Sequence, residues 1–555
     1  MLCHLTRSVR RTTGHLIPWA GCTLLIACGG GGGGDSSGFA TDFSVGGRVS
    51  GLSGTGLVLT DNGGDDLAIS ADGSFTFSTR IAANGAYSVA VKTQPSATPA
   101  QRCTVTGGSG LVGSTNVTSV SVNCHTAVGK FLYVANRNSN SVAAFRITAT
   151  TGALAAIPGS PFATGASGPM YVYAHPSGKY LYVIGFGTSA ATIEGFAIDE
   201  ATGALAALPA ASLSVPSAGV EGAFTADRSG TALALALPSM GVFSCAIDAA
   251  TGAISSGGTG YGFGAGGVAI TGLVFDASAA FLYLANGTSV NVYLVDATTR
   301  ALTPAAVPSV TPAIVSAGPG RPTLALGLNP QGSRLYVTTG DVAPAVPVAA
   351  GNAISAFNTD PIAGLGTEVG TAVAAGPYPI QLAFDRGGTH LYASNLGLSA
   401  NSGAAGFGPG SVSAYDVDTA TGALTEMPGS PFATGGGFSV GIAISATGKH
   451  AVVTNAFVPP LTAAGSVAVF GVDAASGALA AVAGSPFGIA ANGGPSVVSL
   501  DPSGQFAYVA DGQNNTVASY AIDAVTGAPT LVGSALSSGG TQGGNLAAPA
   551  IAGLQ

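Results

Sequence analysis

The sequence predicts an all-β protein whose larger part is a β-propeller, a ring of four-stranded blades preceded by a small β-sandwich. Two observations predict the ring. A unit recurs every 49 to 60 residues between Gly129 and the C-terminus, and its clear copies hold two turn motifs between short apolar runs. One such unit cannot bury both of its faces, whereas units stacked in a ring bury them against each other.

The clearest copy spans Gly168–Leu205. Its first turn, Pro176-Ser177-Gly178, separates two runs rich in Tyr, Val and Ile, and its second turn runs from Asp199 to Gly203. Proline sets the first turn dihedral and glycine accepts the left-handed one, so both segments favour hairpins. No helical stripe of ten residues occurs, and the copy therefore predicts four strands.

The copies align on a turn glycine four residues before the tyrosine of the second strand. The aligned positions are Gly129, Gly178, Gly230, Ala279, Gly332, Gly388, Gly448 and Gly504. The first copy lacks a first strand, and residues Ala547–Gln555 read as that strand, so we expect the two ends to pair and close the ring. The count predicts eight blades. Seven is the alternative, because copies 5 to 7 align loosely around long insertions.

Composition indicates an exported protein rich in turns. Charged residues make up 8% of the 555, and 86 residues are glycine. The net charge is −8, and removal of residues 1–27 takes away three arginines and no acids. The acidic surface argues against nucleic acid as a partner. No apolar run of about 18 residues lies beyond the N-terminus, so we expect no internal membrane span.

Residues 1–27 read as a secretory signal, with Arg7, Arg10 and Arg11 before an apolar segment. The end of this segment, Leu25-Ile26-Ala27-Cys28-Gly29, resembles the bacterial lipobox, which implies that Cys28 is acylated and becomes the N-terminus. An ordinary signal peptide with an incidental cysteine is the alternative. The Gly29 position resembles the outer-membrane sorting pattern, although the face of that membrane stays open. Residues 28–40 then form a Gly/Ser-rich tether.

Residues 41–125 predict a separate small antiparallel β-sandwich with turn signals between short strand-like runs. Cys103 and Cys124 lie in its last two strands. Export favours a disulfide between them, and two reduced thiols are the alternative. The propeller takes residues 126–555. Cys245, in its third copy, reads as a buried structural thiol.

Three long inserts follow the second strand of consecutive copies, at Gly340–Ala350, Gly397–Gly410 and Ala456–Ala464. Because they follow the same strand in each unit, we expect them on one face of the ring. They are the best candidate for a recognition surface. Neutral growth of tolerated loops is the alternative.

The copies Leu132-Tyr133-Val134-Ala135-Asn136 and Ala507-Tyr508-Val509-Ala510 resemble the YVTN propeller repeat. Together with the Thr-Gly-Ala-Leu turns and the Gly-Ser-Pro-Phe strand, they resemble the lactonase-type propeller family, which includes 6-phosphogluconolactonases and is usually seven-bladed. The resemblance implies the fold over the whole propeller. It also implies a His, Glu and Arg set facing the central channel, and that set is largely missing here.

Only Glu221 and Arg321 are charged residues at the start of a first strand, where they could face the channel. They are the weak catalytic candidates, with an ordinary ion pair as the alternative. His390 and His450 occupy one repeat position beside a hairpin and read as structural. The loops Asn136–Asn140 and Asp511–Asn515 read as ordinary turns, so no metal or cofactor site is predicted.

Two functions are therefore carried forward. The first is a lipid-anchored envelope module, expected to be monomeric, that binds or scaffolds a protein or carbohydrate. The second is a lactone-ring hydrolase resembling 6-phosphogluconolactonase, with Glu221 and Arg321 as the residues to test. The sequence leaves the ligand and any catalysis open.

Overall fold

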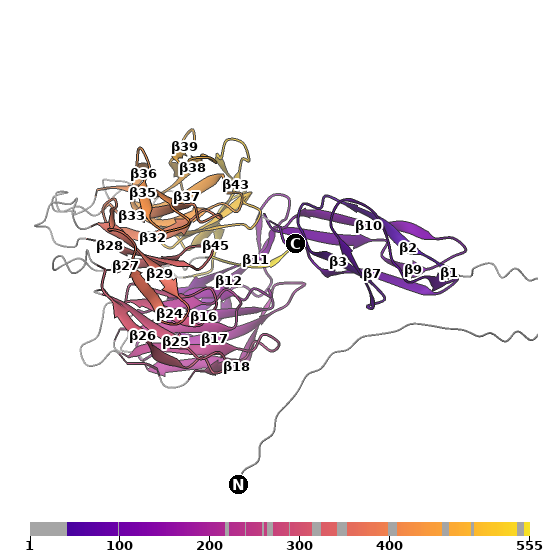
Figure 1. The fold of residues 1–555 in the computed structure, drawn as a ribbon, viewed down its shortest axis with the longest axis horizontal. Coiled ribbons are helices and arrows are strands. Elements are labelled where there is room, and N and C mark those ends of the chain that lie inside the picture. The colour runs from indigo at the N-terminus through magenta and orange to yellow at the C-terminus, as the bar shows by residue number, and fades with distance from the viewer. Residues whose placement is uncertain are drawn as a thin grey trace, which may run out of the picture.

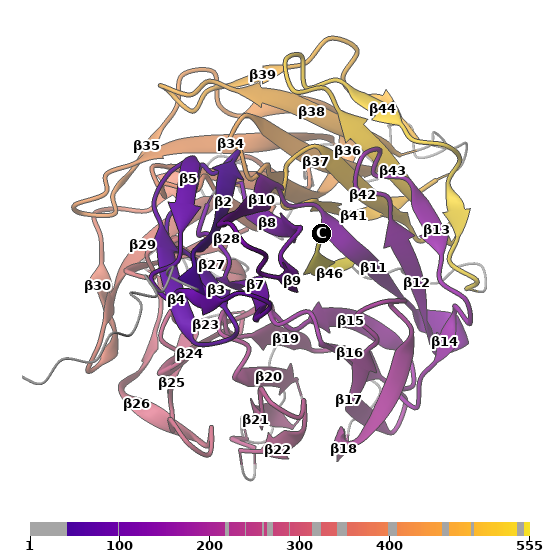
Figure 2. The same ribbon diagram turned by 90° about the vertical axis from the view of Figure 1, so that its right-hand side faces the viewer.

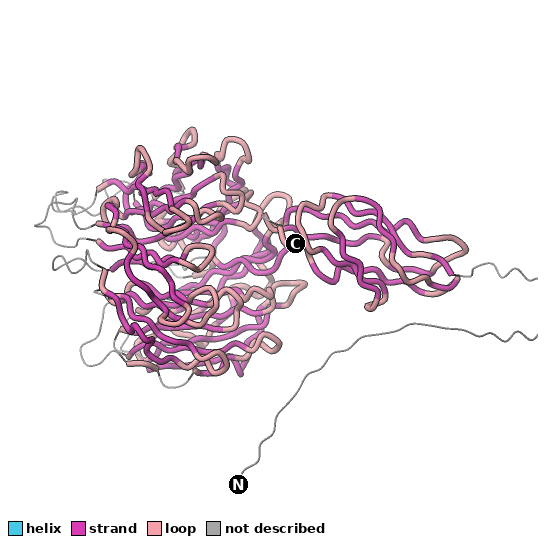
Figure 3. Tube along the Cα trace, viewed as in Figure 1, coloured by secondary structure: helices cyan, strands magenta, loops and turns pink. Residues whose placement is uncertain are grey.

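A computed structural model describes most of the chain from residue 42 onward. The described ranges are 42–97, 99–216, 221–238, 240–257, 260–262, 270–287, 289–312, 323–340, 352–397, 408–457, 465–489, 493–540 and 549–555. These residues are almost entirely strands and loops (Figure 3). Within them, no helix has the length and apolar character needed to cross a bilayer.

The N-terminal unit contains two four-stranded sheets, in the orders β5-β2-β10-β8 and β4-β3-β7-β9, and a short β1-β6 pair. Its strands are β1 (Asp42–Phe43), β2 (Val45–Ser50), β3 (Leu57–Asp61), β4 (Asp65–Ile69), β5 (Gly73–Thr76), β6 (Ile81–Ala82), β7 (Ala86–Thr93), β8 (Gln101–Thr106), β9 (Ser109–Leu111) and β10 (Val117–Thr126). Strand β10 pairs with β2 in parallel, so the expectation of a purely antiparallel arrangement is wrong at this pair. The register places two residues of β10 and β8 directly opposite each other, Cys124 and Cys103. They form the predicted disulfide.

The remaining strands form eight sets, which we call blades 1 to 8. Blade 1 contains β11 (Gly129–Asn136), η1 (Arg137–Ser139), β12 (Ser141–Ile147), β13 (Leu154–Ala156) and β14 (Phe162–Ala163), and blade 2 contains β15 (Pro169–Ala174), β16 (Tyr180–Phe186), β17 (Ala190–Ile198) and β18 (Leu205–Pro216). Blade 3 contains β19 (Ala223–Ala226), β20 (Ala232–Leu237), β21 (Gly241–Ile247) and β22 (Ile254–Ser256), and blade 4 contains β23 (Gly272–Phe275), β24 (Phe281–Ala285), β25 (Val290–Val295) and β26 (Leu302–Val310).

Blade 5 contains β27 (Thr323–Leu328), β28 (Arg334–Thr339), β29 (Ala353–Asp360), β30 (Gly364–Glu368) and β31 (Val373–Ala374), and blade 6 contains β32 (Pro379–Phe384), β33 (His390–Asn395), β34 (Pro409–Val417) and β35 (Leu424–Glu426). Blade 7 contains β36 (Phe432–Ile444), β37 (His450–Phe457), β38 (Ser466–Val472), β39 (Leu479–Ala481) and β40 (Phe487–Gly488), and blade 8 contains β41 (Pro495–Leu500), β42 (Phe506–Asp511), β43 (Thr516–Ile522), β44 (Pro529–Leu531) and β45 (Leu536–Ser537). Blades 6 and 7 share one sheet, because the long strand β36 also pairs with β34.

The C-terminal strand β46 (Ala550–Leu554) supplies the first strand that blade 1 lacks. It pairs antiparallel with β11, with Phe131 opposite Ala552 and Tyr133 opposite Ala550. The predicted closure of the ring by its two ends is thereby confirmed. Figure 2 shows the blades arranged around a common axis, with β46 beside β11.

Hydrophobic clusters join each blade to the next. Each of eight clusters combines residues of two successive blades, and one of them joins blade 8 to blade 1 through Tyr508, Val517 and Leu132. The buried apolar area between blades is the dominant stabilising contribution in such a fold.

The repeated residues make the contacts between blades. In five blades the tyrosine of the second strand donates a hydrogen bond to the carbonyl of the glycine in the next blade's outer turn. The pairs are Tyr133–Gly203 and Tyr182–Gly252 at 2.8 Å, Tyr283–Gly364 at 2.8 Å, Tyr336–Gly422 at 3.0 Å and Tyr392–Gly477 at 2.7 Å. The repeat therefore specifies how one blade docks on the next.

The N-terminal unit lies against one side of the ring (Figure 1). Strand β10 leads directly into Gly129, which occupies the position of the first-turn glycines in the other blades. The hairpin turns therefore lie on the side of the N-terminal unit, whereas loops between second and third strands emerge on the opposite side, which we call the loop face.

Candidate functional site

The first strands of the blades surround the axis of the ring, and they are uncharged. None of β15, β19, β23, β27, β32, β36, β41 and β46 contains Asp, Glu, Lys, Arg or His. Their described side chains are mostly half-buried, as are all those of β19. The inner wall is therefore accessible in part, and it presents apolar and aromatic side chains with a few hydroxyls and amides.

Glu221 lies two residues before β19, near the axis on the loop face, as the sequence predicts for the start of a first strand. Its carboxylate forms an ion pair with the guanidinium of Arg137, which belongs to η1 of blade 1. The side chain of Glu221 is 45% exposed and that of Arg137 is 27% exposed. The pair thus bridges blades 1 and 3 across the start of blade 2 and remains open to solvent.

Tyr171 of β15 lies beside this ion pair. Its hydroxyl donates to the carbonyl of Gly222 at 3.5 Å, a long contact. Burial raises the pKa of Tyr171, and the negative charge of Glu221 raises it further. The phenol therefore stays protonated at neutral pH and acts as a hydrogen-bond donor.

Aromatic rings continue from Tyr171 along the inner wall of blades 2 and 3. The ring of Tyr171 stacks on Phe224 with centroids 5.9 Å apart, and Phe224 meets Tyr173 at 6.3 Å. Phe186 packs edge-on against Tyr171 at 6.1 Å. Tyr171, Tyr173 and Phe224 are half-buried and form the aromatic wall of the site, whereas Phe186 is 6% exposed and belongs to the core between blades 2 and 3.

Arg321 lies outside the described residues, as does Cys28. Its expected approach to Glu221 thus stays a prediction, and the partner of Glu221 in the structure is Arg137. The sequence interpretation missed Arg137 because it read the loop Asn136–Asn140 only for metal ligands. The position of that loop, after a second strand and next to the following blade's first strand, was the available signal. The three long inserts fall mostly outside the described ranges, at 341–351, 398–407 and 458–464.

His390 and His450 occupy the repeat position that follows the turn glycine by two residues. A Cβ added to Gly477 would lie 2.4 Å from the His390 ring, and one added to Gly527 would lie 2.5 Å from the His450 ring. Phe131 makes the same contact with Gly203 at 2.5 Å. The histidines therefore fill the space that an aromatic ring fills in blade 1, in agreement with the structural interpretation.

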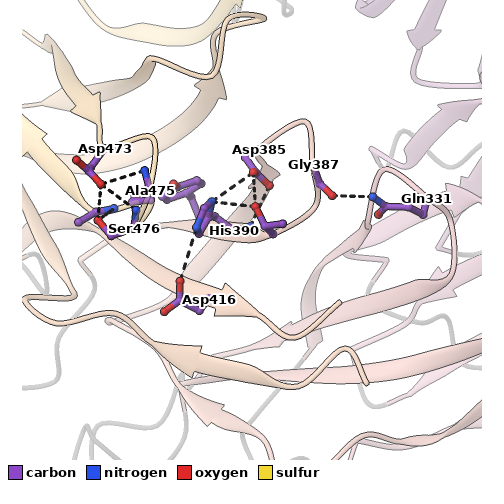
Figure 4. A network of polar contacts seen from close by, with 12 residues as sticks. Gln331, Asp385, Gly387, His390, Asp416, Asp473, Ala475 and Ser476 are labelled. Carbon is purple, nitrogen blue, oxygen red and sulfur yellow. Dashed lines mark hydrogen bonds and ion pairs between the residues drawn. The ribbon is translucent and has the colours of Figure 1, made fainter. Parts of the chain in front are cut away.

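The polar network around His390 consists of contacts with residues in and beside the hairpin turns (Figure 4). The ring nitrogen Nδ1 lies 3.3 Å from a carboxylate oxygen of Asp385, and Nε2 lies 3.7 Å from Asp416. The other oxygen of Asp385 accepts the backbone N–H of His390 at 2.9 Å. Asp473 accepts the backbone N–H of Ser476 at 2.8 Å, which lowers the pKa of its carboxyl.

His175 and Cys245 are also buried, both at the contact between blades 2 and 3. His175 bonds Ser177 at 2.8 Å and the carbonyl of Gly230 at 3.1 Å. Cys245 is 1% exposed, and burial raises the pKa of its thiol to about 12. A thiol with this pKa is a poor nucleophile at neutral pH. Among the described residues, no group of three or more His, Cys, Asp or Glu side chains is arranged to hold a metal ion.

Comparison with known families and structures finds similar propellers. The family described as "Lactonase, 7-bladed beta-propeller" matches residues 100–220 and 409–542. Similar solved structures include a candidate 6-phosphogluconolactonase of Bacteroides uniformis, with 17% identity and a TM-score of 0.46 over 74% of this chain and 97% of that chain. The periplasmic gluconolactonase PpgL of Pseudomonas aeruginosa has 17% identity and a TM-score of 0.46 over 75% and 98%. No curated protein matches the sequence.

Proposed function

We propose that this chain, two segments of which match a lactonase-type β-propeller family, serves as a non-catalytic binding module of the cell envelope. The observation that carries the proposal is the inner wall, where the described first strands present aromatic and apolar side chains and no charged group. Such a wall favours binding of a ligand by stacking and burial over transfer of protons.

We infer that all eight blades close a single ring, one more than the family description states. The inference is supported by eight hydrophobic clusters between successive blades and by the pairing of β46 with β11. An eighth blade widens a ring, because the diameter grows with the number of sheets around the axis. The wider inner wall would admit a larger ligand.

A carbohydrate is the ligand class that the site favours. The faces of sugar rings are apolar and pack on aromatic side chains, while their hydroxyls bond to charged and amide groups at the edge of a site. Here Tyr171, Tyr173 and Phe224 supply the rings, and Glu221 with Arg137 supplies exposed hydrogen-bonding groups beside them. The net charge of −8 also favours a neutral ligand over an anionic one.

Affinity electrophoresis against a panel of soluble neutral polysaccharides tests this function. The protein should be retarded by at least one polysaccharide, and Phe224→Ala should reduce the retardation, because it removes a stacked ring. Leu294→Ala, at an exposed position of the outer half of blade 4, is the matched control and should bind normally. Equal retardation of both variants, or none by any member, would refute the carbohydrate proposal.

The envelope location rests on the signal and on Cys28. We propose that acylation of Cys28 anchors the chain to the outer membrane through the tether of residues 28–40. Cell fractionation of a Cys28→Ala variant tests it. The variant should move from the membrane to the soluble fraction, and a variant that still partitions with membranes would disprove the anchor.

A lactone-ring hydrolase is the second candidate. It is favoured by the family match and by the Glu221–Arg137 pair beside the protonated phenol of Tyr171. In that case Arg137 would stabilise the developing oxyanion and Glu221 would activate water. Turnover of a five- or six-membered lactone that Glu221→Gln abolishes would establish this candidate and reject the non-catalytic one.

A further inference from the structure

Blade 8 departs from its sister blades in the loop before its outermost strand. Blades 1, 6 and 7 carry Gly-Ser-Pro-Phe here, with prolines Pro161, Pro431 and Pro486. Blade 8 carries Gly533-Ser534-Ala535-Leu536 in the same register, because Leu536 lies opposite Val517 as Phe162 lies opposite Val142. Ala535 therefore stands where the sister blades have proline.

In the sister blades the proline ring packs against the connection of the preceding blade. A Cβ added to Gly539 of blade 8 would lie 2.9 Å from Cγ of Pro161. A Cβ added to Gly435, in the part of β36 that pairs with blade 6, would lie 2.7 Å from Cδ of Pro486 of blade 7. The space between two blades at this level is thus filled by a prolyl ring that the chain itself supplies.

At this level of blade 8, the described residues leave a space of their own. A cavity of about 330 Å³ lies between Ala535 and the preceding blade, where Gly488 and Ile489 form its far wall. Val509, Tyr520 and Leu531 complete its apolar lining. Nothing lies within 4 Å of a Cβ added to Gly533, whereas the equivalent Gly159 faces the ring of Phe162 at 3.4 Å.

The cavity also presents hydroxyl groups that have no partner among the described residues. Ser160 and Ser485 of the sister loops accept a backbone N–H, at 2.8 Å and 3.0 Å. Ser534 makes no such bond within the described part of the chain, and the hydroxyls of Thr516 and Tyr520 likewise make none there. Tyr520 is only 7% exposed, so its hydroxyl gains a partner only from a ligand or water in the cavity.

We propose that this cavity binds a proline-containing segment of a partner polypeptide. The occupant is indicated by the sister blades, which place a Ser-Pro unit of their own against the same inter-blade surface. The prolyl ring would pack on Ile489 and Val509, and the hydroxyl of Tyr520 would donate to a peptide carbonyl, the combination used in recognition of proline-rich segments. Asp511 closes one end, and its carboxylate already accepts the backbone N–H groups of Gly494 and Gln513 at 3.0 Å.

Isothermal titration calorimetry of the full chain with the peptide acetyl-Gly-Ser-Pro-Phe-amide tests the proposal. We expect saturable binding at one site with a Kd of about 1 mM or tighter. Acetyl-Gly-Ser-Ala-Phe-amide is the matched peptide and should bind at least about tenfold more weakly, because it lacks the ring that fills the cavity. Equal binding of the two peptides, or no saturation, would overturn the proposal.

Two protein variants separate this cavity from other sites. Ala535→Pro supplies the missing ring from the chain itself, so it should abolish peptide binding while raising or preserving the melting temperature. Tyr520→Phe retains the ring and should weaken binding about three- to tenfold through loss of one hydrogen bond. Binding unaffected by both variants would place the peptide elsewhere. Binding of indole but not of peptide would show a site for small apolar molecules and reject the polypeptide partner.

Discussion

The docking of each blade on the next turn can be tested at His390 and Gly477. Gly477 has a φ of +66°, and a Cβ added there would lie 2.4 Å from the His390 ring. Gly477→Ala therefore introduces two separate costs, a left-handed backbone at a residue with a side chain and a steric overlap with the ring of the preceding blade.

The two costs are of known size. A left-handed conformation costs a non-glycine residue about 1–2 kcal/mol, and overpacking of an interface costs about 1–3 kcal/mol. Their sum is about 2–5 kcal/mol. A ring of about 430 residues unfolds with an entropy near 0.9 kcal/mol per kelvin, so the melting temperature should fall by about 2–5 °C.

Thermal unfolding monitored by circular dichroism measures the effect, and two further proteins separate the costs. Gly370→Ala is the control, because Gly370 has a φ of +63° and nothing lies within 4 Å of its added Cβ. It should show only the backbone cost, about 1–2 °C. In the background of His390→Ala the overlap disappears, and the effect of Gly477→Ala should shrink to that of the control. An unchanged effect in that background would refute the docking argument.

Three other predictions concern single groups. Tyr392→Phe removes the donor to a buried carbonyl in the next blade and should cost about 1–3 kcal/mol in thermal unfolding, whereas Tyr508→Phe should be neutral because the buried Tyr508 hydroxyl has no hydrogen-bond partner among the described residues. Burial lowers the pKa of His450 below its ordinary value of 6.5, so the folded state binds fewer protons than the unfolded one. Stability should therefore fall as the pH drops below 6.5, and His450→Phe should flatten that part of the stability profile; a loss of equal size in the variant would contradict the assignment. Reduction of the disulfide, or replacement of Cys103 and Cys124 by serine, should destabilise the N-terminal unit by about 3 kcal/mol while leaving the melting of the ring unchanged. Limited proteolysis with separate detection of the two parts checks it.

The ring could be predicted from the sequence because its information is local and repeated. The backbone conformation of a turn such as Pro176-Ser177-Gly178 is set by its own residues, and the aligned copies of the repeat supply the same signal several times. The closing strand Ala550–Leu554 was predictable because blade 1 lacked one strand and the chain ended with one in excess. The parallel pairing of β10 with β2 was not predictable, since strand direction within a sheet depends on contacts distant in sequence.

The candidate site was less predictable because it unites residues that no repeat position marks. Glu221 was identified from its place before a first strand, but its partner Arg137 lies 84 positions away in a loop of another blade. The aromatic wall also combines β15 and β19, whose facing side chains follow from the geometry of the ring. The repeated positions mark contacts that the blades have in common, whereas the candidate site combines residues that occur in single blades.

The contact between a blade and the next turn survives where the repeated tyrosine is lost or makes no contact. Blade 3 has Ala234, and blade 7 has Val452, where the other blades have tyrosine. In blade 3 the cross-strand neighbour Ser244 donates to the carbonyl of Arg300 in the next turn. Blade 8 uses the equivalent serine, Ser519, which donates to the carbonyl of Gly152 at 2.7 Å, and the hydroxyl of Tyr508 has no partner within the part of the chain that the structure describes. One hydrogen bond to the neighbouring turn is thus made by two residue types. Contacts between blades thus persist where the residue identity does not.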